Sequence, residues 1–113
     1  MIFLGAFEEF SPGMGFPSMR EYLQEEPYET KQAVLERLRA GNVHMTAPGV
    51  ILDVISGENT YQPLLHMNDG EYTWTTRLIY YIDRYNLRLP MEVENGFLRK
   101  AAYDGTNVCA VRI

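Results

Sequence analysis

The residue types that most often do chemistry are scarce in this chain. Its two histidines, His44 and His66, lie 22 positions apart, and its single cysteine is Cys109. Neither histidine has a second His or Cys at metal-ligand spacing, so a zinc ion would need distant carboxylates. Cys109 lies in an apolar run, where a thiol is usually a small buried side chain rather than a nucleophile. These residues predict no metal site and no cysteine catalysis.

The carboxylates are plentiful, but their spacing does not fit two-carboxylate catalysis. Glu8 and Glu9 are adjacent, as are Glu25 and Glu26. Neighbouring residues on a helix face different directions, whereas that mechanism needs both groups to face one substrate. No glycine starts the strand–loop–helix cradle that binds phosphates. We therefore expect no catalytic residues and no cofactor, and the protein is predicted not to be an enzyme.

The acidic residues are concentrated in the first third of the chain. The net charge is −5, from 15 acidic and 10 basic residues. Residues 1–36 hold seven acids and two bases, while residues 37–113 hold eight of each. Such a field repels phosphate backbones and attracts basic surfaces. Nucleic-acid binding is excluded on charge. The acidic region is then either a solvated face or a binding face for a basic partner.

Chain length, apolar segments and cysteine count also indicate the domain organisation and the cellular compartment. A chain of 113 residues is one domain's worth, so we expect a single domain over 1–113. The first residues lack the basic start and long apolar run of a secretory signal, and no stretch is long and apolar enough for a membrane span. One cysteine cannot form an internal disulfide. We expect a cytoplasmic protein without membrane contact.

The elements that must position any site are helices at both ends and strands between them. Ser18 and Glu21 have the spacing of a capping box and predict a short helix over 19–25. Residues 28–40 are strong helix formers that end at Gly41. Further along the chain, helices are expected over 76–86, capped by Thr75 or Thr76, and over 91–103.

The strands are predicted from alternation and turn residues. Alternating residues 42–47 form one. After Pro48 and Gly49 a mostly buried strand is expected over 50–55, followed by a turn at Gly57-Glu58-Asn59. A further strand starts at Pro63, and Asp69 with Gly70 is a strong hairpin signal leading into 71–74. A final strand is expected over 108–111. The prediction is an α+β domain: an antiparallel sheet of three or four strands packed with three to four helices.

Aromatic residues near the acidic cluster indicate protein binding. The first 17 residues contain four phenylalanines and Met14, which either remain exposed or fold back over the sheet. Exposed aromatics beside carboxylates suit a basic protein partner. The residues predicted to bind the partner are Glu8, Glu9, Tyr22, Glu25, Glu26, Tyr28 and Glu29.

One stretch of the chain resembles a module of small bacterial proteins. The resemblance covers residues 47–90 and is carried by two sets of residues. The first runs from Ala47-Pro48-Gly49 to Asp53-Val54 and Ser56-Gly57-Glu58. The second is Asp69-Gly70-Glu71-Tyr72-Thr73-Trp74, Leu78-Ile79-Tyr80-Tyr81-Ile82, Tyr85 and Leu89-Pro90.

Small acidic proteins of this kind resemble the immunity proteins of bacterial toxin systems, including contact-dependent growth inhibition. That resemblance implies tight binding to the C-terminal domain of a cognate toxin, often a nuclease, and a block of its active site or substrate access. A nuclease has a basic face, so this expectation agrees with the acidic first third of the chain.

Two other functions remain open from the sequence. One is a small-molecule-binding or housekeeping domain, and the other is an oligomerising structural domain. The first predicts a pocket against the 76–86 helix, lined by Tyr72, Trp74, Tyr80, Tyr81 and Tyr85.

Overall fold

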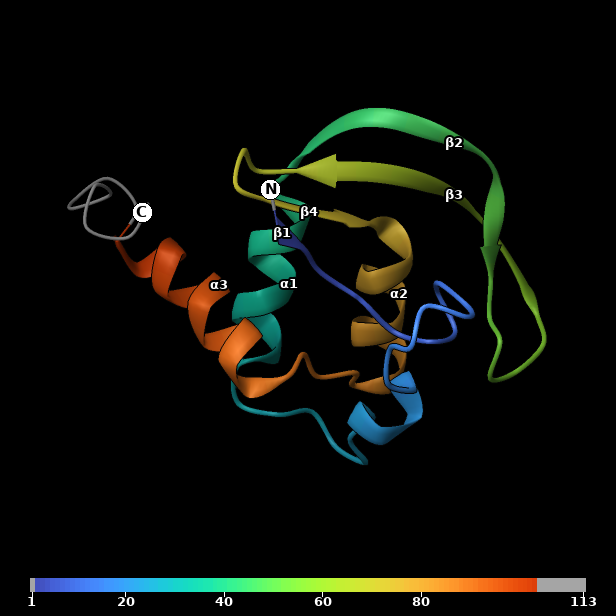
Figure 1. The fold of residues 1–113 in the computed structure, drawn as a ribbon, viewed down its shortest axis with the longest axis horizontal. Coiled ribbons are helices and arrows are strands. Elements are labelled where there is room, and N and C mark those ends of the chain that lie inside the picture. The colour runs from blue at the N-terminus through green and yellow to red at the C-terminus, as the bar shows by residue number, and fades with distance from the viewer. Residues whose placement is uncertain (1, 104–113) are drawn as a thin grey trace.

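The computed structural model describes residues 2–103 and contains one four-stranded sheet in the order β1-β4-β3-β2 (Figure 1). The strands are β1 (Ile2–Phe3), β2 (Asn42–Leu52), β3 (Asn59–Asn68) and β4 (Tyr72–Thr75). β2, β3 and β4 pair in antiparallel fashion, whereas β1 pairs parallel with β4. The predicted α+β class is confirmed. The sheet is mixed rather than antiparallel, because the N-terminal residues, expected to be irregular, add β1.

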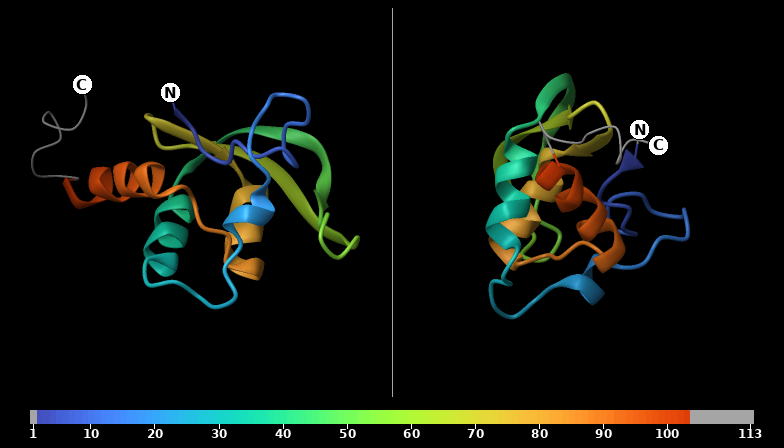
Figure 2. Two further views of the ribbon diagram at one scale, coloured as in Figure 1. Left: turned by 60° about the horizontal axis from the view of Figure 1, so that its bottom comes forward. Right: turned by 90° about the vertical axis from the view of Figure 1, so that its left-hand side faces the viewer.

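The helices gather on one side of this sheet (Figure 2). They are the short 3-10 helix η1 (Met19–Tyr22), α1 (Lys31–Arg39), α2 (Thr76–Tyr85) and α3 (Met91–Tyr103). β2 and β3 together form a curved two-stranded arm that extends past the helices (Figures 1 and 2). None of the helices within residues 2–103 lies against one side of this arm.

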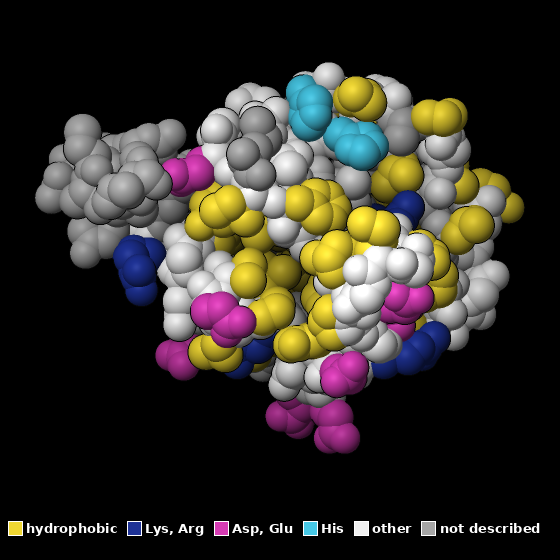
Figure 3. Space-filling view, viewed as in Figure 1, with side chains coloured by type: hydrophobic (Ala, Val, Ile, Leu, Met, Phe, Trp, Pro, Cys, Tyr) yellow, Lys and Arg dark blue, Asp and Glu magenta, His cyan; other side chains and the backbone are white. Residues whose placement is uncertain are grey.

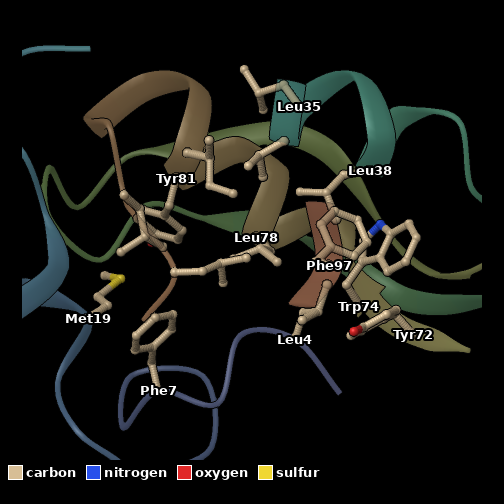
Figure 4. Packing of buried hydrophobic residues seen from close by; sticks show 14 of the residues in the cluster. Leu4, Phe7, Met19, Leu35, Leu38, Tyr72, Trp74, Leu78, Tyr81 and Phe97 are labelled. Carbon is tan, nitrogen blue, oxygen red and sulfur yellow. The ribbon is translucent and has the colours of Figure 1, made fainter. Parts of the chain in front are cut away.

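A single hydrophobic core lies between the helices and the sheet (Figure 4). Phe97 of α3 packs edge-on against Tyr72 and Trp74 of β4, with ring centroids 5.1 and 5.9 Å apart. Trp74 is completely buried, as expected for a core residue. The buried members of the core are Leu4, Phe7, Met19, Val34, Leu35, Leu38, Met67, Tyr72, Trp74, Leu78, Tyr81, Ile82, Leu87, Leu89 and Phe97.

The predicted helix over 19–25 is only the single turn η1, and its capping differs from the capping box. The Ser18 hydroxyl accepts from the Arg20 amide, and Glu21 is exposed. Glu9 from the preceding loop instead accepts from the Ser18 hydroxyl at 2.5 Å and from the Met19 amide at 2.8 Å. The Glu9 carboxylate therefore accepts hydrogen bonds from the donors at the start of η1. This contact joins residues that are distant in sequence, so the local Ser18–Glu21 spacing could not reveal it.

The two strands predicted around Pro48 and Gly49 are one continuous strand, β2. The register with β3 shifts between Thr46 and Val50, and Gly49 has φ of +100°. Proline and glycine therefore produce a bulge within one strand here instead of separating two strands. The strand expected over 50–55 is not mostly buried: Ile51 is buried, but Val50 and Leu52 are exposed, because helices cover only one face.

β3 begins earlier than predicted, so Pro63 lies inside the strand rather than at its start. Proline cannot donate a ladder hydrogen bond, yet it is tolerated where one side of the strand has no neighbour. Pro63 pairs with Val50 of β2, and the pairing of β3 with β4 begins only at His66. Pro63 therefore lies in the two-stranded part of the arm.

The hairpin and the later helices agree closely with the sequence pattern. The Asp69 amide donates to the Tyr72 carbonyl at 3.1 Å, and Gly70 has φ of +92°. α2 and α3 have the predicted extents within one residue, and the buried residues of α2 are Leu78, Tyr81 and Ile82. α1 begins at Lys31, later than the expected residue 28. The strand expected over 108–111 and Cys109 lie outside the described residues.

Gly41 permits close packing of Trp74 at the end of α1. A Cβ atom at residue 41 would overlap Trp74 Cζ2 and lie 2.9 Å from Trp74 Cη2 and 3.2 Å from the Asn68 carbonyl oxygen. We expect Gly41→Ala to lower the free energy of unfolding by about 1–3 kcal/mol, because the buried indole must shift. Urea unfolding followed by circular dichroism measures this. Ala40→Gly, at the neighbouring exposed position, is the control and should cost at most about 1 kcal/mol. Equal losses would show that overlap with Trp74 does not matter.

Candidate protein-binding site

Four of the predicted partner-binding residues lie on one acidic loop, residues 23–30, between η1 and α1: Glu25, Glu26, Tyr28 and Glu29. Glu25, Glu26 and Glu29 are exposed, and none of them makes a hydrogen bond or ion pair within the described part of the chain. The next residue, Lys31, cannot neutralise them, because it is buried. Its Nζ donates to the Asp83 carbonyl at 3.0 Å and to Asn86 Oδ1 at 2.8 Å. Glu29 interacts electrostatically with Arg88, so the uncompensated negative charge of the loop lies on Glu25 and Glu26.

The acidic loop is attached to the body of the protein at both ends. At its start, Leu23 forms a β-bridge with Leu87, and the Gln24 amide donates to the Asn86 carbonyl at 3.2 Å. Near its end, the Tyr28 hydroxyl donates to the Leu87 carbonyl at 2.7 Å. Burial of the ring and the negative charge of Glu94 raise the pKa of Tyr28 to about 12. Tyr28 is thus a neutral anchor that holds the loop.

A buried ion pair supports this anchor. Arg88 Nε and Nη2 each donate to one oxygen of the Glu94 carboxylate at 3.1 Å, which is a two-bond pairing. Glu94 is only 1% exposed. The Arg88 guanidinium also lies 4.9 Å from the centre of the Tyr28 ring. Arg88 and Glu94 were not singled out from the sequence, where a helix N-terminal Glu is usually a solvated residue.

A groove of about 240 Å³ adjoins the start of the acidic loop. Tyr22 forms part of its wall, while its ring also packs against Phe7 in the core, with centroids 5.6 Å apart. Met91 at the other wall is 51% exposed. The groove is mainly apolar, with Gln24 and Arg88 as its polar residues, and it suits the aliphatic part of a long side chain. The residues lining the groove are Tyr22, Gln24, Arg88, Leu89, Pro90 and Met91.

Glu8 and Glu9 have different environments, although both were predicted to bind the partner. Glu8 is exposed and accepts from the Gly13 amide at 3.3 Å. Glu9 is occupied by Ser18 and Met19, and Arg20 lies 3.9 Å away. Burial raises the pKa of Glu9, but these hydrogen bonds and the charge of Arg20 outweigh it, so the net shift is downward. Glu9 is thus ionised and stabilises η1, leaving Glu8 as the accessible carboxylate of the pair.

The apolar side chains of the first 17 residues divide between core and surface. Phe7 is buried and packs edge-on against Phe10, which in turn lies 5.5 Å from the Tyr81 ring. Phe3 and Met14 are exposed. Part of the segment therefore folds back over the core, and the rest stays on the surface.

The tyrosines and tryptophan proposed to line one pocket lie in two separate groups. Tyr72 and Trp74 pack with Phe97 in the core, whereas Tyr80, Tyr81 and Tyr85 of α2 surround the start of the 53–58 turn. A recess of about 370 Å³ reaches only Tyr80 of the five. Its other lining residues are polar: Ser56, Glu58, Asn59, Thr60, Gln62 and Arg84.

The centre of the second group is a buried carboxylate that sequence reasoning did not single out. Asp53 is 2% exposed, and one of its oxygens accepts from both Tyr80 and Tyr85 hydroxyls at 2.6 Å. The other oxygen accepts from the amides of Ile55 and Ser56 at 2.8 and 2.9 Å. Burial raises the pKa of Asp53, but these four hydrogen bonds lower it more, so the net pKa lies well below the ordinary range. One sign of this buried carboxylate is present in the sequence, which is that Asp53 is the single acid inside a run of β-branched and aliphatic residues.

The two histidines, far apart in sequence, are neighbours on the arm. Their ring centroids are 6.2 Å apart, and the Asn68 side-chain amide nitrogen lies 2.9 Å from His44 Nδ1. Among residues 2–103, no group of three or more His, Cys, Asp or Glu side chains is placed to hold a metal ion.

No protein-family model matches this chain, and no curated protein or solved structure matches it either. The resemblance to toxin-immunity proteins therefore stays a prediction. No helix within the described residues is long and apolar enough to cross a membrane.

Proposed function

We propose that this protein is an immunity protein that binds and neutralises the C-terminal domain of a bacterial toxin, with a nuclease as the toxin class. The observation that carries the proposal is the acidic loop, where Glu25, Glu26 and Glu29 are exposed and the first two have no cationic partner among the described residues. Acidic side chains also gather along the lower edge of the molecule, around η1 and this loop (Figure 3). A nuclease must present a basic face to bind nucleic acid, and this edge is complementary to such a face in charge.

The rigid attachment of the acidic loop also suits an inhibitor. Tyr28 and the Leu23–Leu87 bridge hold the acidic loop at both ends, so less conformational entropy is lost when a partner binds. The adjoining groove can receive the aliphatic stem of an Arg or Lys side chain while the carboxylates bind its charged end. Electrostatic steering then speeds the encounter, which an inhibitor needs in order to intercept each toxin molecule.

Charge reversal on the loop tests this proposal. The partner is the toxin-like domain encoded immediately upstream of this chain's gene, and binding is measured by titration calorimetry at low and high salt. We expect the double variant Glu25→Lys with Glu26→Lys to weaken binding at least about tenfold, a loss of about 1.4 kcal/mol. The loss should be greatest at low salt, because charge repulsion is screened by ions.

A matched control separates this face from the total charge. Glu36→Lys with Glu58→Lys changes the net charge equally at two exposed positions outside the loop. This control should bind nearly as tightly as the parent protein. Equal weakening in both double variants would argue against the acidic loop as the contact. Absence of binding between the parent protein and the upstream domain would overturn the immunity function itself.

A further inference from the structure

The outer edge of the sheet lacks the charged side chains that often protect edge strands. β2 is the last strand in the order β1-β4-β3-β2, so within residues 2–103 one side of its backbone has no strand beside it. Proteins commonly protect such an edge with charged side chains, because unpaired amides and carbonyls can pair with another strand. No residue from Asn42 to Leu52 is a Lys, Arg, Asp or Glu, and the same holds from Asn59 to Asn68.

The exposed side chains on this edge include several apolar ones among polar residues without formal charge. Residues 42–46 and 48–50 are all exposed. Val43 is 53% exposed and Met45 is 57% exposed. Hydrophobic side chains and the two histidines gather over the arm, on the opposite side of the molecule from the acidic lower edge (Figure 3). The arm therefore combines unpaired backbone with apolar surface, which are the two requirements for adding a strand.

The distribution of charge favours a second copy of this chain as the occupant. Two copies each carry a net charge of −5 and repel one another through their acidic regions. Approach along the uncharged arms places these regions far apart, where salt screens the repulsion. An uncharged edge also gives no attraction for the basic partner proposed above. Antiparallel pairing of one strand with itself is moreover compatible with twofold symmetry, the commonest symmetry of protein dimers.

The bulge limits where the pairing can occur. Pro48 has no amide hydrogen, and Gly49 with φ of +100° interrupts the register of the strand. The register with β3 also shifts between Val43 and Met45, so the straightest part of the free edge begins at Met45. We propose that residues 43–47 of β2, centred on Met45, pair in antiparallel fashion with residues 43–47 of a second copy, joining the two four-stranded sheets into one. This inference does not rest on the proposed function, since the dimer uses the arm and not the acidic loop.

The test is the molar mass of the full chain in solution as a function of concentration. Light scattering after size exclusion, across a hundredfold range of micromolar concentrations, should show the mass rising from 13.0 kDa toward twice that value. Met45→Lys should shift the dimerisation constant at least about tenfold toward monomer, because a lysine at the edge opposes strand addition. Met91→Lys is the matched control: Met91 has a similar exposure of 51% but lies on α3. This control should dimerise like the parent protein.

Hydrogen exchange identifies the surface that pairs, and circular dichroism checks that the variants are folded. Amides within 43–47 should exchange more slowly at high than at low protein concentration, while those of the acidic loop should not change. A circular dichroism spectrum equal to that of the parent protein shows that Met45→Lys is folded, and Val43→Lys replaces it if it is not. A chain that stays monomeric throughout, or protection confined to another surface, would overturn the proposal.

Discussion

Asp53→Ala is expected to lower the free energy of unfolding by about 3–5 kcal/mol, one of the two largest losses that the structure indicates. The substitution removes one buried carboxylate and leaves two tyrosine hydroxyls and two backbone amides without their acceptor. Hydrogen bonds to a charged group contribute more than neutral ones, and buried donors left unpaired are costly. Urea unfolding followed by circular dichroism gives the value.

Single tyrosine variants measure how much of this loss comes from each hydroxyl that donates to Asp53. Tyr80→Phe and Tyr85→Phe each remove one donor to the same Asp53 oxygen, so each should cost about 1.5–3 kcal/mol. Asp53→Ala in the Tyr80→Phe and Tyr85→Phe background should then cost less than in the parent protein, because only the amides lose a partner. Additive losses would show that the carboxylate and the hydroxyls are not energetically coupled.

The pH dependence of stability gives an independent measure of the same carboxylate. The pKa of Asp53 is lower in the folded protein than the unfolded value of about 3.9. Its contribution is therefore complete above that value and is lost as the pH falls toward the folded pKa. We expect the free energy of unfolding to fall below about pH 4, and to fall less steeply in Asp53→Asn, which cannot take up this proton. Parallel slopes would contradict a lowered pKa.

Arg88→Met is the other substitution with a large expected effect. It leaves the Glu94 carboxylate, 1% exposed, without its two-bond partner, and removes the cation stacked on Tyr28. Breaking a buried ion pair in this way costs about 3–5 kcal/mol, because the remaining charge is buried without compensation. Thermal unfolding at neutral pH measures the loss. The acidic loop should also become more susceptible to proteolysis, since Tyr28 anchors it.

A double-mutant cycle distinguishes loss of the ion pair from loss of packing. Arg88→Met with Glu94→Leu removes both charges and keeps apolar volume, so it should recover most of the stability lost in Arg88→Met alone. A double variant as unstable as Arg88→Met would mean that Arg88 acts through its packing on Tyr28 and not through Glu94.

The sequence pattern predicted the elements well where local signals decide the structure. The Asp69-Gly70 hairpin and the extents of α2 and α3 depend on turn chemistry and apolar periodicity, which are local properties. The prediction that Pro48 and Gly49 separate two strands was wrong, because their effect depends on whether β3 continues beside them. β1 was missed because a two-residue strand has no periodicity and depends entirely on β4 as its neighbour.

The candidate site was predictable only in part, for the same reason. Exposed carboxylates such as Glu25 and Glu26 follow from composition, since nothing nearby in sequence pairs with them. The roles of Glu9 and Asp53 depend on contacts with residues 9 to 32 positions away, which a single sequence does not reveal. The Arg88–Glu94 pair is closer in sequence, but its burial depends on Tyr28 packing over it.

The packing around Trp74 gives this protein a built-in optical reporter. Trp74 is the only tryptophan, its side chain is fully buried, and its indole N–H has no hydrogen-bond partner among the described residues. An indole in such an apolar site emits at short wavelength, and exposure to water moves the emission to longer wavelength. Because Phe97 of α3 covers the ring, undocking of that helix alone should shift the spectrum before the sheet unfolds. Fluorescence and circular dichroism, recorded together, can therefore separate release of α3 from global unfolding without any added label.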